Sequence, residues 1–295
     1  MTLIDYIKPL LDDVLADEPM SRHTSFRIGG PGEVVARPTK TEEFIAICEV
    51  CKKHNFPLTV LGDGANVLVS DEGISGVVVI TNKMKDIELL EGSRIRAQCG
   101  ARMSAVAEAA AKTGLSGLAF ASGIPGTIGG GIYMNAGAYG HSISDFCASV
   151  TVYRNGETIE IPVSDMGFGY RESIIQKKPA LILSAVFQLN PGDTTQIREE
   201  MKDINSRRRV SQPLEYPSAG STFKRPEGYY AGKLIQDSGL KGFFIGGAEV
   251  SEKHAGFIIN KGNATAKDVR NLVEHVRKKV HEDSGVWLEP EVRFI

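Results

Sequence analysis

The sequence predicts an α+β fold divided into more than one domain. Helical and strand patterns alternate between residues 41 and 189, which is typical of domains that combine helices with mixed sheets. A chain of 295 residues also exceeds the size of most single hydrophobic cores. The stretch Asn190-Pro-Gly-Asp-Thr194 interrupts the pattern, so we place the main domain boundary there.

In the first half of the chain, local patterns predict the elements in order. Residues 3–16 are predicted to form a short amphipathic helix that ends before Pro19. Residues 33–37 are predicted to be a strand. A helix is expected from Thr41, because two acids in its first turn complement the helix dipole. Residues 57–61 form an apolar run typical of a buried strand.

Farther along, the patterns predict two hairpins, one helix and one long strand. The strongest signal is Asn155-Gly156, because this dipeptide favours the two-residue turn of a β-hairpin. An alanine-rich segment that stops at Gly114 is predicted to be helical. These hairpins, helix and strand comprise residues 87–99, 149–161, 104–112 and 181–189.

Beyond Asn190, two more helices and a terminal strand are expected. The first helix covers residues 195–209 and ends in three arginines, which complement the helix dipole. Thr265 opens the second helix, with Asp268 three residues later as an approximate capping box. Its apolar face consists of Val269, Leu272, Val273, Val276 and Val280. The tail, residues 286–295, is predicted to be a strand.

Composition excludes several classes of function. A net charge of −2 gives no sign of a surface that binds nucleic acid or a membrane. No run of about 18 apolar residues exists, so no membrane-spanning helix is expected. The start of the chain carries acids inside its apolar pattern, unlike a signal peptide. Cys48 and Cys51 lack the second ligand pair of a zinc site, so no metal is expected. Free thiols indicate a reducing, cytoplasmic setting, and no protein partner is predicted.

Two glycine-rich stretches are the strongest candidates for ligand binding. In the stretch from Ser122 to Gly140, successive turns would aim several N–H groups at one anion, such as a pyrophosphate. The alternative is a tight loop without a ligand. The second stretch, residues 62–68, is not a Rossmann fingerprint, because Val67 occupies the third glycine position and no helix follows.

Four polar groups are candidates for chemistry, each with a simpler alternative. Arg171 could bind a carboxylate, or pair with Glu172 at the surface. Ser221, in a Gly-Ser-Thr turn, could donate a proton, although such turns are common. His254 could act as a base or be a structural histidine. Glu291 lies on one strand face with Glu289, and the pair could simply be exposed.

Taken together, six stretches in the same order make the sequence resemble the UDP-N-acetylenolpyruvoylglucosamine reductase family. The departure from the family is Ala65, where members commonly carry serine; we expect a lost hydroxyl contact and an unchanged fold. The matching stretches are His23-Thr-Ser-Phe-Arg-Ile-Gly-Gly30, Gly62-Asp-Gly-Ala-Asn-Val-Leu68, Gly123-Ile-Pro-Gly-Thr-Ile-Gly-Gly130, Tyr170-Arg-Glu-Ser173, Ala219-Gly-Ser-Thr-Phe-Lys224 and Leu288-Glu-Pro-Glu-Val-Arg293.

This resemblance implies an FAD-binding region similar to vanillyl-alcohol-oxidase/p-cresol-methylhydroxylase flavoproteins. Residues 1–190 would form it as two α+β subdomains, roughly 1–80 and 81–190, and residues 191–295 would form an α+β substrate-binding domain. The resemblance implies that FAD is bound non-covalently by Gly62, Asp63, Gly64, Ala65, Asn66, Val67, Leu68, Gly123, Ile124, Pro125, Gly126, Thr127, Ile128, Gly129 and Gly130.

The resemblance also implies the reaction and its catalytic residues. NADPH would supply a hydride through FAD to the enolpyruvyl ether of UDP-N-acetylglucosamine enolpyruvate, which yields UDP-N-acetylmuramate for peptidoglycan. Arg171 would neutralise the substrate carboxylate. Glu291 would stabilise the enol, for which burial should raise its pKa, and Ser221 would protonate C2.

Substrate binding is also inferred from the resemblance. The chain is similar to the shorter subtype of the family, which lacks a substrate-covering insert with its tyrosine. The substrate is therefore expected to contact Tyr170, and the diphosphate to be held by Arg209, Lys224 and Arg225.

Two other functions are compatible with the residues. One is an FAD-dependent oxidase or dehydrogenase of the same fold that acts on an alcohol or hydroxy acid. Such enzymes often tether flavin through histidine, and His23, His54 and His141 lie in the relevant half without a recognised tether motif. The other is a flavin-free protein that binds nucleotide sugars. It would be colourless and would not need Ser221 or Glu291.

Overall fold

The computed structural model describes residues 2–295 and divides the chain into two compact units that interleave along the sequence. Unit 1 contains the chain up to Leu15, Val34–Asp63 and Gly76–Arg208. Unit 2 contains Ala16–Glu33, Gly64–Ser75 and Arg209–Ile295. Within residues 2–295, none of the helices is both long and apolar enough to cross a membrane. The domain boundaries predicted near residues 80 and 190 stay predictions. The two compact units are divided at other residues.

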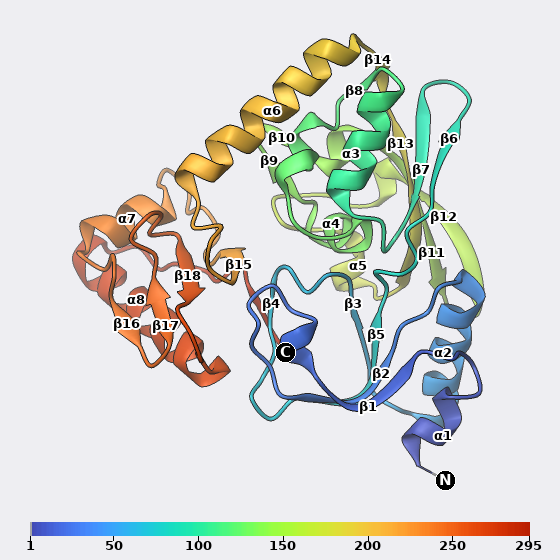
Figure 1. Ribbon diagram of the computed structural model, residues 1–295, viewed down its shortest axis with the longest axis horizontal. Coiled ribbons are helices and arrows are strands. Elements are labelled where there is room, and N and C mark those ends of the chain that lie inside the picture. The colour runs from blue at the N-terminus through green and yellow to red at the C-terminus, as the bar shows by residue number, and fades with distance from the viewer. Residues whose placement is uncertain (1) are drawn as a thin grey trace. The chain divides into compact units, whose positions relative to one another are not determined.

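The first sheet has the strand order β1-β2-β5-β3. Strands β3 and β5 run parallel, with Leu58 opposite Val77 and Leu61 opposite Ile80. Helices α1 and α2 pack against each other beside these strands (Figure 1). The bounds are α1 Leu3–Ile7, β1 Val14–Pro19, β2 Pro31–Ala36, α2 Thr41–His54, β3 Leu58–Leu61, β4 Val67–Leu68 and β5 Ile74–Ile80.

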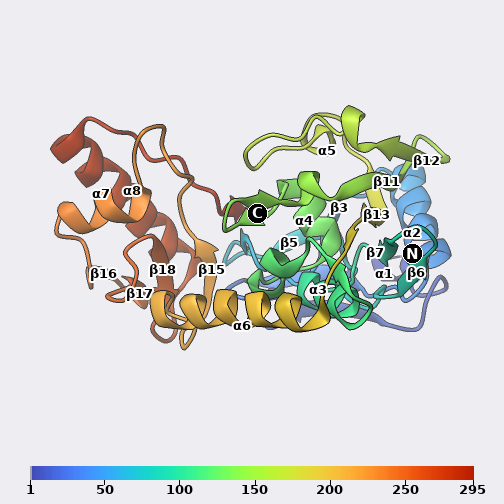
Figure 2. The same cartoon turned by 90° about the horizontal axis from the view of Figure 1, so that it is seen from above.

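The second sheet of unit 1 is antiparallel in the order β12-β11-β13-β7-β6. Helices α3 and α4 pack against its strand β7 (Figure 2). The bounds are β6 Ile87–Leu90, β7 Arg94–Gln98, α3 Met103–Lys112, β8 Leu115–Ser116, α4 Ile128–Met134, β9 Gly137–Ala138, β10 His141–Ser142, β11 Cys147–Arg154, β12 Glu157–Pro162, α5 Ile174–Lys177, β13 Leu181–Gln188, β14 Asn190–Pro191 and α6 Thr194–Ser211.

Unit 2 has its own sheet, with the order β15-β18-β17-β16, and its own apolar core. Helix α8 packs on β16 and β17 and against α7 (Figure 1). Strand β19 pairs in parallel with β4, so that Arg293 lies opposite Val67. The bounds are β15 Ser218–Ser221, α7 Ala231–Asp237, β16 Phe244–Ile245, β17 Ala248–Val250, β18 Phe257–Asn260, α8 Ala266–Ser284 and β19 Arg293–Phe294.

Local chemistry explains why α8 begins and ends where it does. Thr265 Oγ1 accepts a hydrogen bond from the Asp268 backbone N–H at 3.0 Å, as the predicted capping box requires. Asp71 adds a carboxylate that accepts from the N–H groups of Ala266 and Lys267 at 2.7 and 3.0 Å. These bonds satisfy N–H groups that a helix start leaves unpaired. The predicted apolar face of α8 is buried throughout.

The structure confirms the α+β class and most predicted elements. The hairpin turn at Asn155-Gly156 has φ of 56° and 91°, as the two-residue turn demands. The helix predicted over residues 3–16 is wrong, because α1 ends at Ile7 and residues 14–19 form β1. Pro9 lacks the N–H that a continuing helix would use.

Two other segments also differ from expectation. Within the glycine-rich stretch, expected to be turns, residues Ile128–Met134 form α4. The predicted terminal strand is reduced to Arg293–Phe294, because Pro290 cannot donate to a ladder.

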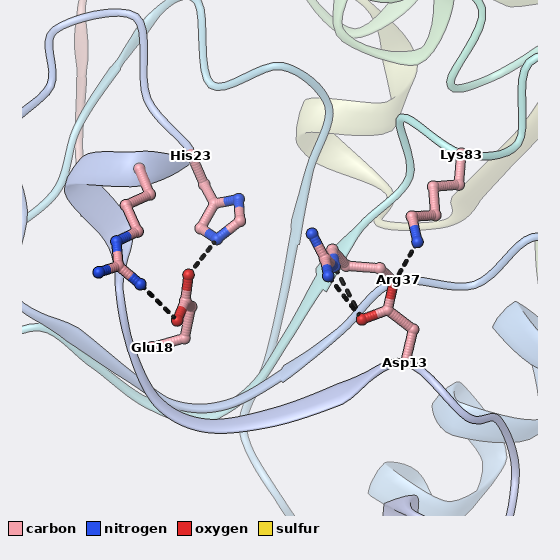
Figure 3. A network of polar contacts seen from close by, with 6 residues as sticks. Asp13, Glu18, His23, Arg37 and Lys83 are labelled. Atoms are coloured by element: carbon pink, nitrogen blue, oxygen red, sulfur yellow. Dashed lines mark hydrogen bonds and ion pairs between the residues drawn. The ribbon is translucent and has the colours of Figure 1, made fainter.

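An ion-pair cluster in unit 1 makes stability depend on pH. Asp13 receives hydrogen bonds from Arg37 Nε and Nη2, at 2.9 and 2.7 Å, and from Lys83 (Figure 3). Partial burial of the Asp13 carboxylate is outweighed by these bonds and charges, so its pKa is lowered. Its stabilising effect is therefore complete above the pKa of the unfolded chain and is lost as pH falls through the lower folded pKa.

We predict that Asp13→Asn lowers the free energy of unfolding at neutral pH. The difference from the parent protein should shrink as pH falls below about 4, where the parent's Asp13 also becomes protonated. Urea unfolding between pH 7 and pH 3 measures this. The control is Asp203→Asn in the exposed Asp203–Arg207 pair, which should have little effect at any pH. A constant difference for Asp13→Asn across the pH range contradicts the prediction.

Candidate active site

The two predicted cofactor loops meet inside unit 1 at Gly62 and Thr127. Gly62 directly follows β3, and Thr127 directly precedes α4. A Cβ atom on Gly62 would lie 2.1 Å from Thr127 Oγ1, so glycine is required for this approach. The amides of Ile128 and Gly129 donate to the carbonyls of Ala101 and Cys99 at 2.8 and 2.7 Å. These two amides therefore already donate to protein carbonyls. Fewer backbone N–H groups remain for an anion than the sequence predicts.

A charged contact supports the first loop from the side. The Asp63 carboxylate accepts hydrogen bonds from Arg102 Nε at 3.0 Å and Asn82 Nδ2 at 3.3 Å. Arg102 also forms an isolated β-bridge with Thr127, so its backbone and its side chain join the two loops. The sequence analysis missed Arg102, because its connection to Asp63 arises only from the tertiary fold.

Two features of the loops in unit 1 fit a bound cofactor. Thr127 Oγ1 is buried, and it has no hydrogen-bond partner within residues 2–295. Burying an unpaired hydroxyl is costly, so a ligand atom that pairs with it would remove that cost. Gly130 is exposed, and a Cβ there would find its nearest neighbour, Thr127 Oγ1, only at 3.9 Å. The surface at Gly130 thus leaves room for a ligand to approach the backbone.

The open space at Gly130 yields a prediction. Gly130→Ala should leave the flavin-free protein equally stable, or more stable by about 0.5–1 kcal/mol, because alanine favours a helix. FAD should nevertheless bind more weakly, because the new methyl group occupies the ligand's approach. FAD titration and urea unfolding of flavin-free protein measure the two effects.

The matched control is Gly62→Ala, which has no room for a methyl group. It should weaken FAD binding and also destabilise the flavin-free protein by about 1–3 kcal/mol through overpacking. Unchanged FAD affinity in Gly130→Ala would show that the cofactor does not approach α4 at this residue.

Unit 1 also holds Tyr170 and Arg171 in a specific conformation. Arg171 has a φ of 60°, which is uncommon for a residue with a side chain. Gln176 Nε2 donates to its carbonyl oxygen at 3.0 Å, and Arg171 Nη2 donates to the Gly137 carbonyl at 3.4 Å. The guanidinium lies 5.0 Å from the centre of the exposed Tyr170 ring. The geometry holds a positive charge beside an exposed aromatic ring.

The three consecutive arginines of α6 have different surroundings. Arg207 pairs with Asp203 at 2.7 Å on an exposed part of the helix. Arg208 packs its Cδ about 3.4 Å from the Cβ position of Gly123, and burial lowers the pKa of its guanidinium. Of the three, only Arg209 is predicted from the sequence as a substrate ligand, and Arg208 is considered there only as part of the triple-arginine helix end. Helical spacing from the buried Ile204 could have identified it, since residues four apart share a face.

In unit 2, the segments that carry Ser221 and Glu291 are joined directly. The Glu291 N–H donates to the Thr222 carbonyl at 2.8 Å, and Phe223 forms a β-bridge with Pro290. Gly220 has a φ of 74°, and the register of β15 against β18 shifts between Ser218 and Ser221. Such a bulge re-aims the following side chain, and Ser221 is exposed here. A hydroxyl and a carboxyl group are thus carried by neighbouring, hydrogen-bonded segments.

The predicted diphosphate ligands of unit 2 already contact other groups. Lys224 Nζ pairs with the exposed carboxylate of Glu289. The Arg225 guanidinium lies 4.0 Å from the centre of the Tyr230 ring. Arg209 accepts a hydrogen bond at its backbone carbonyl from Lys253 Nζ at 2.8 Å. An incoming diphosphate would replace Glu289 as the partner of Lys224, since carboxylate and phosphate oxygens both accept hydrogen bonds from an ammonium group.

The histidines considered in the sequence analysis all contact protein groups. His254 Nδ1 accepts from the Gly256 N–H at 3.1 Å, and burial lowers the pKa of its imidazole, which fits a structural role. His23 Nε2 lies 3.0 Å from Glu18 Oε1 (Figure 3). His54 packs against the rings of Tyr6 and Phe56, and His141 Nδ1 lies 3.5 Å from Asp145 Oδ2.

Comparison with known proteins first defines the class. The FAD binding domain family matches residues 32–161. A solved structure of a Phl p 4 variant described as a glucose oxidase has 14% identity and a TM-score of 0.51, covering 66% of this chain and 45% of its own. That likeness concerns the fold alone. The protein is an FAD-dependent oxidoreductase.

The same comparisons identify the family. The C-terminal domain of UDP-N-acetylenolpyruvoylglucosamine reductase matches residues 212–295. The reductase of Caldanaerobacter subterraneus subsp. tengcongensis is 48% identical over 99% of this chain and 98% of its own length. The crystal structure of the Thermus caldophilus reductase has 31% identity and a TM-score of 0.82, covering 96% and 98% of the two chains. The chain belongs to the UDP-N-acetylenolpyruvoylglucosamine reductase family.

Proposed function

We propose that this flavoenzyme reduces UDP-N-acetylglucosamine enolpyruvate with NADPH to UDP-N-acetylmuramate, using Arg171, Ser221 and Glu291. Family membership over 99% of the chain supports the overall reaction. The observation that carries the site assignment is the direct bond between the Glu291 and Thr222 backbones, one residue from Ser221. This bond supports the proposal that Ser221 and Glu291 act on the same substrate.

The cofactor provides the redox chemistry, and the protein provides orientation and charge. When bound, FAD would supply hydride transfer from NADPH to C3 of the enolpyruvyl ether. The loops at Gly62–Leu68 and Gly123–Gly130 would hold it, with Thr127 Oγ1 and the space at Gly130 as the features that fit best.

Each proposed catalytic residue acts on a different atom of the substrate. Arg171 orients the carboxylate through paired N–H donors and balances its charge. Hydride addition at C3 leaves negative charge at C2, which spreads into that carboxylate as an enolate. Glu291 stabilises this enolate through a hydrogen bond, and the Ser221 hydroxyl gives its proton to C2. The proton and hydride together convert the vinyl ether to the lactyl ether.

The rest of the substrate would be held by the neighbouring groups. Tyr170 offers an exposed ring, and Arg209, Lys224 and Arg225 are proposed to hold the diphosphate.

All four cysteines are free, and burial raises the pKa of Cys99 and Cys147 to about 12. Unreactive free thiols support the proposed cytoplasmic location, where cysteines are kept reduced.

A visible spectrum of the purified protein tests the function. Flavin bands should bleach on addition of NADPH without oxygen and return when UDP-N-acetylglucosamine enolpyruvate is added. Bands that return only with oxygen would favour an oxidase of the same fold. Acid precipitation should leave the yellow colour in the supernatant, because the flavin is not covalently attached. A colourless protein that FAD cannot reconstitute would contradict the proposal.

A further inference from the structure

Asn66 binds the C-terminal tail at two points, one on each side of Val292. Its side-chain Nδ2 donates to the Glu291 carbonyl at 3.1 Å. Its backbone carbonyl accepts from the Arg293 N–H at 3.0 Å. The side-chain contact joins residues that lie 225 positions apart in sequence. A loop predicted from sequence to bind cofactor therefore also holds the backbone that carries Glu291.

The contacts around Asn66 leave the Glu291 backbone fixed from two directions. On one side, the Glu291 N–H donates to the Thr222 carbonyl at 2.8 Å. On the other side, its carbonyl oxygen accepts from Asn66. Val292 is buried in the same apolar cluster as Leu68 and Leu288, so the backbone cannot slide along the loop without moving a core side chain.

Beyond Val292, backbone pairing holds the tail. Strand β19 pairs with β4, the Ser70 N–H donates to the Ile295 carbonyl at 2.7 Å, and the Ile295 N–H donates to Leu68 at 3.0 Å. These bonds do not depend on the Asn66 side chain. Loss of the carboxamide would thus remove one of the bonds on the Glu291 backbone while the end of the tail stays in place.

We propose that Asn66 is a positioning residue for Glu291, and that its side chain sets the placement of the Glu291 carboxyl group during the half-reaction with the enolpyruvyl substrate. This inference rests on the proposed function of Glu291. Asn66 acts on Glu291 through the hydrogen bond from its side-chain amide to the Glu291 carbonyl. The precision required of a catalytic group explains why one hydrogen bond at its peptide matters, since small misplacements cost large factors in rate.

The two half-reactions provide the test. An FAD titration first measures whether Asn66→Ala weakens cofactor binding, since Asn66 lies in the predicted FAD loop. In stopped-flow measurements at saturating FAD, Asn66→Ala should slow flavin reduction by NADPH less than it slows flavin reoxidation. Flavin reoxidation by saturating substrate should slow about tenfold, the effect of losing one positioning hydrogen bond. Asn66→Asp should behave alike, because an ionised carboxylate of nearly the same shape cannot donate to the Glu291 carbonyl.

A double-mutant cycle shows whether Asn66 acts through Glu291. In a Glu291→Ala background, adding Asn66→Ala should change the reoxidation rate by less than about threefold, because the group being positioned is absent. Independent, multiplying effects would contradict the proposal. So would Asn66 variants that reoxidise at the parent rate while Glu291→Ala is slow.

Asp71→Ala is the control for general loosening of unit 2. It removes two hydrogen bonds from the start of α8, and it should lower stability without changing reoxidation. If Asp71→Ala slows reoxidation as much as Asn66→Ala, the effect is structural and the proposal fails. If flavin reoxidation in Glu291→Ala itself runs at the parent rate, the proposed function of Glu291 fails instead. The Glu291→Ala rate thus distinguishes failure of the Glu291 role from failure of the Asn66 proposal.

Discussion

Ser221→Ala should slow reoxidation of the flavin by the enolpyruvyl substrate by about 10²–10⁴-fold, the usual contribution of a positioned proton donor. Flavin reduction by NADPH should remain within about twofold of the parent protein, because the hydroxyl takes no part in that step. The reason for the large effect is that C2 carries negative charge after hydride addition. Serine is a weak acid in water, but a hydroxyl held at hydrogen-bond distance from such a centre is sufficient.

The measurement separates the two half-reactions by stopped-flow absorbance of the flavin without oxygen. Ser218→Ala is the matched control, since Ser218 lies in the same strand on the other side of the register shift. It should leave both rates near those of the parent. Equal slowing of both half-reactions in Ser221→Ala would remove Ser221 from the role of proton donor and point to a general defect in the site.

Local signals in the sequence were enough to predict the elements that depend on neighbouring residues. The hairpin at Asn155-Gly156 and the capped start of α8 at Thr265 follow from turn and capping chemistry within a few residues. The failure at residues 3–16 has the opposite cause. The helical pattern there is overridden when residues 14–19 pair in a sheet, which local periodicity does not report.

The interleaving of the two units could not be read from the sequence for a related reason. Strand β4 near residue 67 pairs with β19 near residue 293, and both lie in unit 2. Composition and chain breaks locate boundaries along the chain, whereas a compact unit is defined by contacts between distant segments. The boundary at Asn190 therefore marks a break in the sequence pattern. The compact units are defined instead by which distant strands pair with each other.

The proposed site shows the same division between local and long-range information. Glycine-rich stretches and the Gly-Ser-Thr turn drew attention to the loops and to Ser221 without any structure. The carboxamide of Asn66 on the Glu291 peptide and the Arg102 contact to Asp63 arise from the fold, so no spacing rule could have predicted them. Arg208 is an intermediate case, because helical periodicity predicts which of three arginines is buried.

Replacing Glu291 should distinguish a hydrogen-bond donor from a negative charge. Glu291→Ala should slow reoxidation by about 10²–10³-fold, comparable to removing one donor from an oxyanion site. Glu291→Gln should be less affected, by about tenfold, because the amide keeps an N–H donor for the enol oxygen. Flavin reduction by NADPH should be unchanged in both.

The pH dependence gives the stronger discrimination, because only a glutamic acid can lose its donor proton. If the protonated form of Glu291 stabilises the enol, parent reoxidation must fall as pH rises through the pKa of that group, approaching tenfold per pH unit. Glu291→Gln should lack this dependence, since its amide does not titrate. The control is Glu289→Gln, whose exposed carboxylate pairs with Lys224, and which should keep the parent profile at saturating substrate. The contrary outcome is a parent rate that rises with pH through this range, with Glu291→Gln as slow as Glu291→Ala. It would require an ionised Glu291. The positive charge needed at the enol would then have to come from Arg171 alone.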